Sequence, residues 1–478
     1  MARSCSCTEF TRSQLMRAGV AQAGRGVAQA GRGLPTIEPG MPLPAGTGMN
    51  RRTFLLRSAG GVLAVYGAGA LSPRHLEAGI AQAAAAAPPK QPVIVSIFME
   101  GGWDALSVLA PVKEAAYHKL RPQLGRQEGE GVPFGEDETL MWHPQAAGLA
   151  QLHGEGKVTV FPAIGYDPPD ESHFTSRHYW EVGELNTQGR TGWMGRYLDV
   201  AGNPDNPLQG LSLDYSLAPA LATARVPVAA VSTPSDYGLW AYGLDEPLTA
   251  STLEAFGKLG SLSAGSTALA QARTASLDTN LIRQQVAPFA DVEGKPPFTS
   301  PVKYPTSGEE FPVRLAVLAD MLADESLPIK CVSLNAVGGY DTHSDEVETL
   351  ATNLGQTVES VVAFQRDLEA RGLDDRVVIQ LWSEFGRRPQ ENGSGTDHGA
   401  AGLSFLIGSR VRGKMVGEFP GLTKLDENEN LINTSDFRAL YAGLLAQWLG
   451  VEAGLVIPGA GTGLPGPSTY GTVPQLIE

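Results

Sequence analysis

The sequence predicts an α/β fold: a three-layer α/β/α sandwich whose mostly parallel, doubly wound sheet carries helices on both faces. Short apolar runs without polar alternation recur along the chain, and amphipathic stretches lie between them. Such runs are typical of strands buried on both faces of a parallel sheet. The hydrophobic content of 42% is sufficient for a large core.

The individual elements follow from these two patterns. The apolar runs are short and do not alternate with polar residues, which favours strands, and the intervening stretches have amphipathic helical patterns. Residues 200–310 are poorer in both signals and rich in Ala, Ser, Pro and Gly, so we expect insertions on one domain that spans 91–478. Strands are expected at about 92–99, 157–165, 226–232, 329–337, 376–382 and 403–408, and helices at 144–156, 311–325, 348–372 and 436–450.

The first ninety residues have a different character. Arg51 and Arg52, followed by Phe54, precede a weakly apolar run and then a stretch of small residues, the order of an export signal of the twin-arginine (Tat) type. The apolar run is too short and too rich in glycine to span a membrane comfortably. Residues 49–90 therefore predict the Tat translocon as a partner during export, a periplasmic or extracellular location, and no stable membrane span after signal removal.

Residues 1–48 stand in front of this signal. They contain the heptapeptide GVAQAGR twice, at 19–25 and 26–32, and no periodic apolar pattern. We interpret them as a disordered extension, with Met49 as an alternative start. Cys5 and Cys7 lie in this extension, so Cys331 is the single cysteine of the domain and no disulfide framework is expected.

The formal net charge of −15 argues against nucleic acid or an anionic membrane as the main partner.

The polar residues near the ends of the predicted strands indicate a binding or catalytic site. In a doubly wound sheet, ligands bind at the carboxyl ends of the strands. Polar side chains lie next to several predicted strands, at positions expected to converge there: Glu100, Asp104, Ser172, His173, Asp341, His343, Glu384, Asp397 and His398.

Carboxylates and imidazoles together are the ligands that Zn²⁺, Mn²⁺ and Fe prefer. We expect one or two divalent ions, Zn or Mn, held by Glu100, Asp104, Asp341, His343, Glu384, Asp397 and His398. The expected catalytic residues are Ser172, His173 and Arg387, with Ser172 as a nucleophile at the start of a helix. Arg387 and its neighbour Arg388 would offset the acidic surface near an anionic substrate. Simpler interpretations stay open: Ser172 and Asp341 as helix caps, and Glu384 in a salt-bridged loop.

Several segments resemble a known family. GGWDALSVLAP, SHFTSRHYWEVGE, GGYDTHSDE, SEFGRRPQENGSGTDHGAAGLSFLIG and TSDFRALYAGLLAQWLG resemble, in order, the signatures of the bacterial domain of unknown function 1501 family. That family, whose members carry Tat signals, is similar to the alkaline-phosphatase-like superfamily of phosphatases, sulfatases and cofactor-independent phosphoglycerate mutases.

The resemblance implies an alkaline-phosphatase-like core, with Ser172 as nucleophile and Glu100 or Asp104, Asp341 with His343, Glu384 and His398 as metal ligands. Two departures stand out. One residue separates Asp341 from His343 where the superfamily has three, and Phe385 stands where a histidine ligand is expected.

Two functions follow from the sequence. The first is an exported metal-dependent hydrolase that acts on phosphate or sulfate esters, either small molecules or polymers. The alternative is a non-catalytic exported binding or assembly protein with a degenerate site.

Overall fold

The computed structural model describes residues 91–237, 246–291, 296–308, 310–460 and 474–478. The predicted extension and the export signal, residues 1–90, lie outside this part of the chain. Within the described part, no helix combines the length and the apolar character needed to cross a bilayer.

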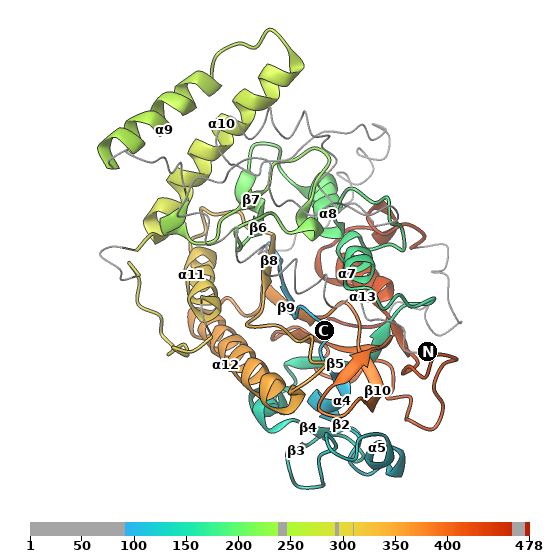
Figure 1. Ribbon diagram of the computed structural model, residues 1–478. Coiled ribbons are helices and arrows are strands. Elements are labelled where there is room, and N and C mark those ends of the chain that lie inside the picture. Colours follow the sequence, from blue (N-terminus) through green and yellow to red (C-terminus); the bar gives the residue numbers. More distant parts are fainter. Residues whose placement is uncertain (1–90, 238–245, 292–295, 309, 461–473) are drawn as a thin grey trace.

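An eight-stranded sheet forms the centre of the molecule (Figure 1), in the order β13-β5-β12-β9-β1-β8-β6-β7. Strand β12 runs antiparallel to both of its neighbours, and the remaining pairs are parallel. The predicted α/β class with a mostly parallel sheet is therefore confirmed. The strands are β1 (Val93–Phe98), β5 (Val158–Gly165), β6 (Gly210–Ser212), β7 (Ala229–Ala230), β8 (Cys331–Asn335), β9 (Val377–Trp382), β12 (Gly402–Ile407) and β13 (Ser435–Asp436).

Helices cover both faces of this sheet. In β1, Val93, Val95 and Ile97 join one buried cluster with side chains of α6, α11 and α12. Ile94 and Phe98 join a second cluster with side chains of α7, α8 and α13, and Figure 1 shows the two sets of helices on opposite sides of the strands. The helices are α4 (Ala105–Val108), α5 (Ala115–Leu120), α6 (Ala147–Gly154), α7 (His173–Val182), α8 (Trp193–Ala201), α9 (Glu246–Gly260), α10 (Thr267–Val286), α11 (Phe311–Ala323), α12 (Glu346–Arg371) and α13 (Phe437–Gly443).

Smaller elements complete the fold. Strands β2 (Leu109–Ala110), β4 (Met141–Trp142) and β3 (Val132–Pro133) form one small sheet, and β10 (Arg387–Glu391) pairs with β11 (Thr396–His398) in another. Helical turns are η1 (Pro144–Ala146), η2 (Pro207–Gln209), η3 (Pro219–Leu221), η4 (Pro234–Asp236), η5 (Ala287–Phe289), the π-turn η6 (Leu444–Trp448) and η7 (Ala453–Leu455).

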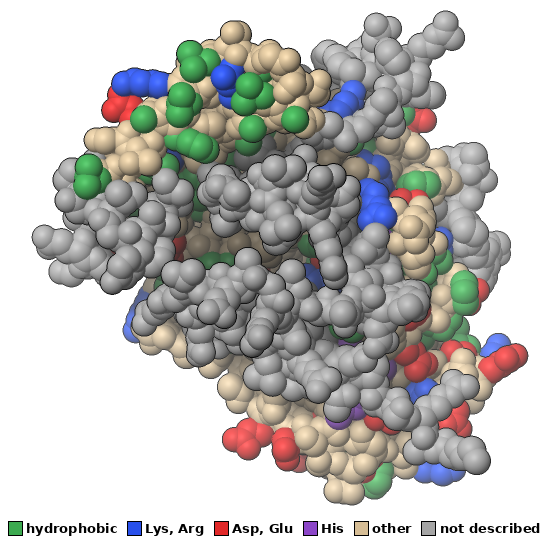
Figure 2. Space-filling view, turned by 45° about the horizontal axis from the view of Figure 1, so that its top comes forward, with side chains coloured by type: hydrophobic (Ala, Val, Ile, Leu, Met, Phe, Trp, Pro, Cys, Tyr) green, Lys and Arg blue, Asp and Glu red, His purple; other side chains and the backbone are tan. Residues whose placement is uncertain are grey.

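Helices α9 and α10 form a projecting pair at the β7 edge of the molecule (Figure 1). Their outer surface carries hydrophobic side chains, visible as green patches in Figure 2. Leu259 of α9 and Leu269 and Leu277 of α10 are each more than 40% exposed. The pair falls within the stretch for which insertions are predicted.

The sheet order explains where the site lies. Strands β5, β9, β1 and β8 are mutually parallel, so their carboxyl ends share one edge of the sheet. Strand β12 lies beside β9 and runs back against it. The connection 383–401, which contains the β10–β11 hairpin, therefore leaves and re-enters the sheet at that same edge.

Candidate metal centre

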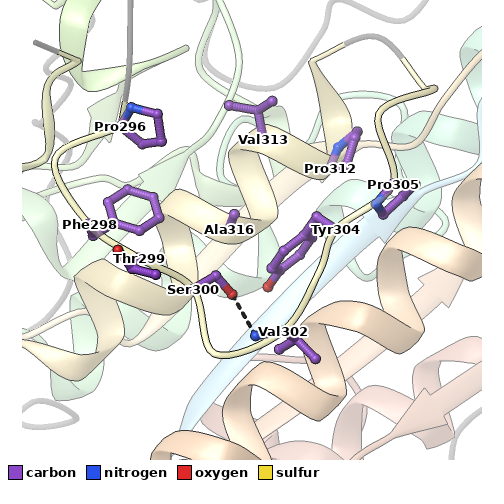
Figure 3. A pocket seen from close by; sticks show the side chains of 10 residues that line it. All are labelled: Pro296, Phe298, Thr299, Ser300, Val302, Tyr304, Pro305, Pro312, Val313 and Ala316. Atoms are coloured by element: carbon purple, nitrogen blue, oxygen red, sulfur yellow. Dashed lines mark hydrogen bonds between the residues drawn. The ribbon is translucent and has the colours of Figure 1, made fainter.

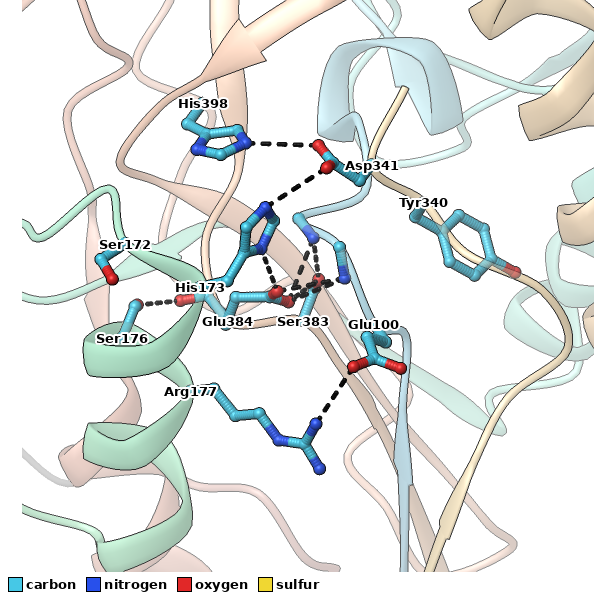
Figure 4. A network of polar contacts seen from close by, with 12 residues as sticks. Glu100, Ser172, His173, Ser176, Arg177, Tyr340, Asp341, Ser383, Glu384 and His398 are labelled. Carbon is cyan, nitrogen blue, oxygen red and sulfur yellow. Dashed lines mark hydrogen bonds and ion pairs between the residues drawn. The ribbon is translucent and has the colours of Figure 1, made fainter. Parts of the chain in front are cut away.

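Three side chains converge at the carboxyl edge of the sheet (Figure 4). Asp341 follows β8, His173 is the first residue of α7 after β5, and His398 ends β11. Their ligand atoms lie within 4.8 Å of one another. Asp341 Oδ1 is 3.2 Å from His398 Nε2, and Asp341 Oδ2 is 3.6 Å from His173 Nε2.

His343 joins the same carboxylate from the solvent side. Its Nε2 lies 3.0 Å from Asp341 Oδ1 and 2.9 Å from His398 Nε2. The side chain is 25% exposed, whereas that of His398 is 8% exposed. Three imidazoles therefore direct their Nε2 atoms at Asp341.

The other ring nitrogen of each histidine contacts an oxygen atom that can only accept. His173 Nδ1 lies 2.7 Å from Glu384 Oε1, His343 Nδ1 lies 3.2 Å from Asp397 Oδ1, and His398 Nδ1 lies 3.0 Å from the Glu171 carbonyl. Each Nδ1 therefore donates, and a neutral ring then presents an Nε2 lone pair. Three lone pairs facing one carboxylate repel it and one another unless positive charge lies among them. A hydrogen bond from Nδ1–H to a carboxylate or a carbonyl oxygen is the usual way in which proteins orient metal-binding histidines.

Glu384 supports His173 from within the protein. The carboxylate is buried, and it accepts the N–H groups of Gly101 at 3.1 Å and Gly102 at 3.1 Å and the Ser383 hydroxyl at 2.9 Å. Burial raises the pKa of Glu384, but His173 and the hydrogen bonds outweigh burial and hold that pKa below its usual range. Glu384 thus stays ionised at neutral pH and fixes the His173 ring.

Arg387 holds Asp341 in the same way. Its fully buried guanidinium lies 2.5 Å from Asp341 Oδ1 through Nη2, and Nη1 donates to the Thr396 carbonyl at 2.6 Å. Burial raises the pKa of Asp341, whereas His173, the other two imidazoles and Arg387 lower it well below its usual range. Arg387 can therefore act on the site only through Asp341 and the backbone.

The carboxylates of Asp341 and Glu384 favour positive charge among the imidazoles. Burial lowers the pKa of His173, but Asp341 and Glu384 more than offset this and raise that pKa to about 9. Burial lowers the pKa of His398, and Asp341 only partly opposes this. Without a metal, a proton on His173 balances part of the negative charge of the carboxylates. A divalent cation would take the place of that proton and balance the same charge. Nitrogen and oxygen donors together suit Zn²⁺ or Mn²⁺.

The structure places the other predicted residues around this cluster. Asp397 is mostly exposed and orients His343, accepting from Asn392 Nδ2 at 2.9 Å. Glu100 lies 3.3 Å from Arg177 Nη1, and its carboxylate points away from His398 in Figure 4.

Two predicted residues have contacts of other kinds. Ser172 is the N-cap of α7, and its hydroxyl accepts the Thr175 N–H at 3.4 Å. Asp104 is completely buried in an ion pair with Arg121 and does not reach the cluster. The sequence predicted His173 to be catalytic, whereas the structure places it among the candidate metal ligands. Its position at the start of a helix that follows a strand is the feature of the sequence that could have indicated metal binding.

Phe385 stands where the resemblance implied a histidine. Its ring centroid lies 4.9 Å from that of His173 and 4.8 Å from that of His398. Phe385 therefore forms an apolar wall against two of the imidazoles and supplies no ligand for a second ion.

A pocket of about 360 Å³ lies elsewhere, between residues 296–305 and α11 (Figure 3). Prolines, Phe298 and Tyr304 line it, and Tyr304 is its one ionisable residue. The Tyr304 hydroxyl donates to Asp367 at 3.0 Å. The lining of this pocket therefore offers few groups that could hold a metal ion or transfer a proton.

A search of solved structures found several that are similar to parts of the chain. The C-terminal periplasmic domain of EcEptC from Escherichia coli, in complex with Zn, has a TM-score of 0.35 and 8% identity over 81% of this chain and 93% of that one. The sulfatase PsFucS1 from Pseudoalteromonas sp. has a TM-score of 0.31 and 10% identity over 80% and 72%.

The soluble domain of lipooligosaccharide phosphoethanolamine transferase A from Neisseria meningitidis has a TM-score of 0.33 and 12% identity over 78% of this chain and 93% of that one. These values are too low to bear on individual site residues. No curated protein matches the sequence.

A family model described as "Protein of unknown function (DUF1501)" matches residues 268–446. This range runs from within α10 to beyond α13 and contains Asp341, His343, Glu384 and His398, whereas His173 precedes it. Residues 268–446 therefore match the model of this family, and the resemblance found in the sequence is confirmed there.

Proposed function

We propose that the protein is a metal-dependent hydrolase of phosphate or sulfate esters, with one divalent cation held by His173, Asp341 and His398. One observation carries the proposal: three imidazole Nε2 atoms face a single carboxylate, and an acceptor oxygen fixes the opposite nitrogen of each ring. His343 is the fourth donor. Zn²⁺ and Mn²⁺ suit this donor set, and when bound such an ion polarises an ester oxygen and acidifies water.

The residues of the chain would position the reaction. Glu384 and Arg387 fix His173 and Asp341, and Phe385 excludes water from one side of the imidazoles. The start of α7 lies beside the cluster, because His173 is its first residue. A helix N-terminus offers N–H groups to an anionic ester group, and Ser172 presents a hydroxyl at that position.

Metal binding is the first test. Protein purified after incubation with Zn²⁺ or Mn²⁺ should retain about one ion per chain by elemental analysis. His173→Ala and His398→Ala should lose it. His118→Ala is the matched control, because His118 contacts the Val112 carbonyl and not Asp341. A wild-type protein that keeps no ion after dialysis would refute the proposal.

Ser172 can be tested without confusing its two roles. Ser172→Ala removes both the hydroxyl and the helix cap, and the lost cap costs about 1 kcal/mol. Ser172→Asn keeps a capping side chain but offers no hydroxyl. If Ser172 is the nucleophile, both variants should lose hydrolysis of aryl phosphates and sulfates while retaining metal. Activity preserved in Ser172→Asn would exclude that role.

The position of Phe385 favours the alternative function, a non-catalytic binding or assembly protein. Because Phe385 stands where the resemblance implies a metal ligand, such a protein would keep the fold and a single cation but lack catalysis. A metal-loaded protein that hydrolyses no member of an aryl phosphate and sulfate ester panel would support this binding or assembly protein. Turnover that depends on added metal would exclude it.

Export belongs to the same proposal. Arg51 and Arg52 precede the apolar run of the expected Tat signal, and a Tat passenger is folded before transport. Replacement of both by lysine should keep the protein in the cytoplasm of a Tat-competent bacterial host. Unchanged delivery to the periplasm or medium would argue for another route.

A further inference from the structure

Two buried carboxyl groups, those of Asp104 and Glu346, interact with each other close to the candidate metal centre. Asp104 and Glu346 are at most 1% exposed, and Arg121, equally buried, pairs with Asp104 through both of its terminal nitrogens. Burial and the charge of Asp104 raise the pKa of Glu346 to about 8. Burial raises the pKa of Asp104, but Arg121 outweighs it and brings that pKa to about 2. At neutral pH the pair therefore shares one proton, and Glu346 is the neutral member.

Glu346 contacts both segments that carry the candidate ligands. Its Oε2 accepts from the Thr396 hydroxyl at 2.6 Å and from the Thr342 hydroxyl at 3.2 Å. Thr342 lies between Asp341 and His343, and Thr396 lies two residues before His398.

The contacts around Glu346 extend into the backbone. The Glu346 N–H donates to the Ser394 carbonyl at 2.9 Å, and the Thr396 N–H donates to the Thr342 carbonyl at 3.1 Å. On the opposite side, Glu346 Oε1 accepts from the Ser107 hydroxyl at 3.2 Å. A single buried carboxyl group thus joins the loop after β8, the hairpin β10–β11 and helix α4.

We propose that Glu346 is a positioning residue of the metal centre, which holds the Asp341 and His398 segments at a fixed separation through the hydroxyls of Thr342 and Thr396. The inference rests on the proposed cation site. A metal needs its donors placed within about 0.5 Å of their bonding positions. Asp341 and His398 come from separate segments, so the connection between those segments controls the geometry of the donors.

The threonine contacts give a clean test. Thr342→Val and Thr396→Val, combined in one chain, remove both hydroxyls while keeping side-chain shape. We expect the affinity for Zn²⁺ alone, measured by competition with a chelating dye, to fall about 10- to 100-fold, as for other groups that orient metal ligands. Thr279→Val is the control, because Thr279 is equally buried and its hydroxyl donates to the Ala275 carbonyl in α10. Its affinity for Zn²⁺ should equal that of the wild type.

Variants of Glu346 itself separate positioning from folding. Glu346→Gln retains an acceptor oxygen for the threonines and a donor toward Asp104, so its Zn²⁺ affinity should stay within about threefold of the wild type. Glu346→Ala should weaken binding like the double threonine variant. If Glu346→Ala does not fold, the threonine variants decide the question.

The possible failures are distinguishable. Wild-type protein that binds no Zn²⁺ overturns the proposed function, and the positioning role with it. Wild-type protein that binds Zn²⁺, together with folded threonine variants of equal affinity, overturns the positioning role alone. Loss of binding in Glu346→Gln as severe as in Glu346→Ala also overturns it, because the neutral isostere should support both threonines.

Discussion

Replacement of Glu384 by glutamine tests the carboxylate that orients His173. Both Glu384 oxygens accept hydrogen bonds, Oε1 from His173 and Gly101 and Oε2 from Gly102 and Ser383. An amide replaces one acceptor with an NH₂ group, which must then face at least one donor. The variant should lose about 1.5–3 kcal/mol of unfolding free energy, the usual contribution of a hydrogen bond to a charged group.

The same change should weaken metal binding. Loss of a carboxylate that orients a metal-bound histidine typically reduces affinity about 10- to 100-fold, which corresponds to roughly 1.4–2.7 kcal/mol. Competition with a chelator at pH 7 measures the affinity, and urea unfolding of the metal-free protein measures the stability. Glu155→Gln provides the control, because Glu155 pairs with Arg366 at the surface, away from the imidazoles.

The outcome that would refute this reasoning is specific. Suppose His173→Ala abolishes Zn²⁺ binding but Glu384→Gln binds Zn²⁺ as tightly as the wild type. The orientation of His173 would then not depend on Glu384. A stability loss no larger than that of Glu155→Gln would show that the buried hydrogen bonds to Glu384 contribute little.

Three further perturbations probe the surroundings of the site. Arg121→Met leaves Asp104 buried without its counter-charge, so urea unfolding at pH 7 should show a loss of roughly 3–5 kcal/mol; a loss below about 1 kcal/mol would contradict the ion pair. The pKa of Glu346 is raised from 4.5 to about 8 in the folded protein. Between these pH values the folded state therefore binds more protons than the unfolded state. The unfolding free energy should fall as pH rises from 4.5 to 8. Glu346→Gln should flatten this pH dependence, and an equal slope in both proteins would contradict the shift. A Cβ at Gly101, where φ is +119°, would lie 2.4 Å from the Asp341 backbone nitrogen, so Gly101→Ala should weaken Zn²⁺ binding, whereas Gly129→Ala, with φ of +87° and open space around it, should not.

Much of the central sheet could be predicted because its signal is local. The run 376–382 is apolar without alternation, and it forms β9, whose six residues are all buried. The predicted helix 348–372 corresponds to α12, Glu346–Arg371, since its apolar positions repeat at the helical period. The run 226–232 gave only the two-residue strand β7, and no local pattern revealed that β12 would run antiparallel to β9. Strand direction depends on how the chain returns to the sheet.

The roles of the acids could not be predicted from composition at the strand ends. Asp341, Glu384 and Asp104 have the same chemistry in the sequence. In the structure Asp341 faces three imidazoles, Glu384 orients one of them, and Asp104 pairs with Arg121. These differences arise from partners far along the chain, such as Gly101, which lies 283 positions from Glu384.

The sequence by itself therefore determined the α/β class, the main strands and helices, and the chain segments that meet at the carboxyl edge. These depend on periodicity and on the common direction of parallel strands. The tertiary structure alone decided which side chains face Asp341, which of them only orient others, and which pair in the interior. Burial and hydrogen-bond partners set those roles, and both are fixed only when distant segments pack together.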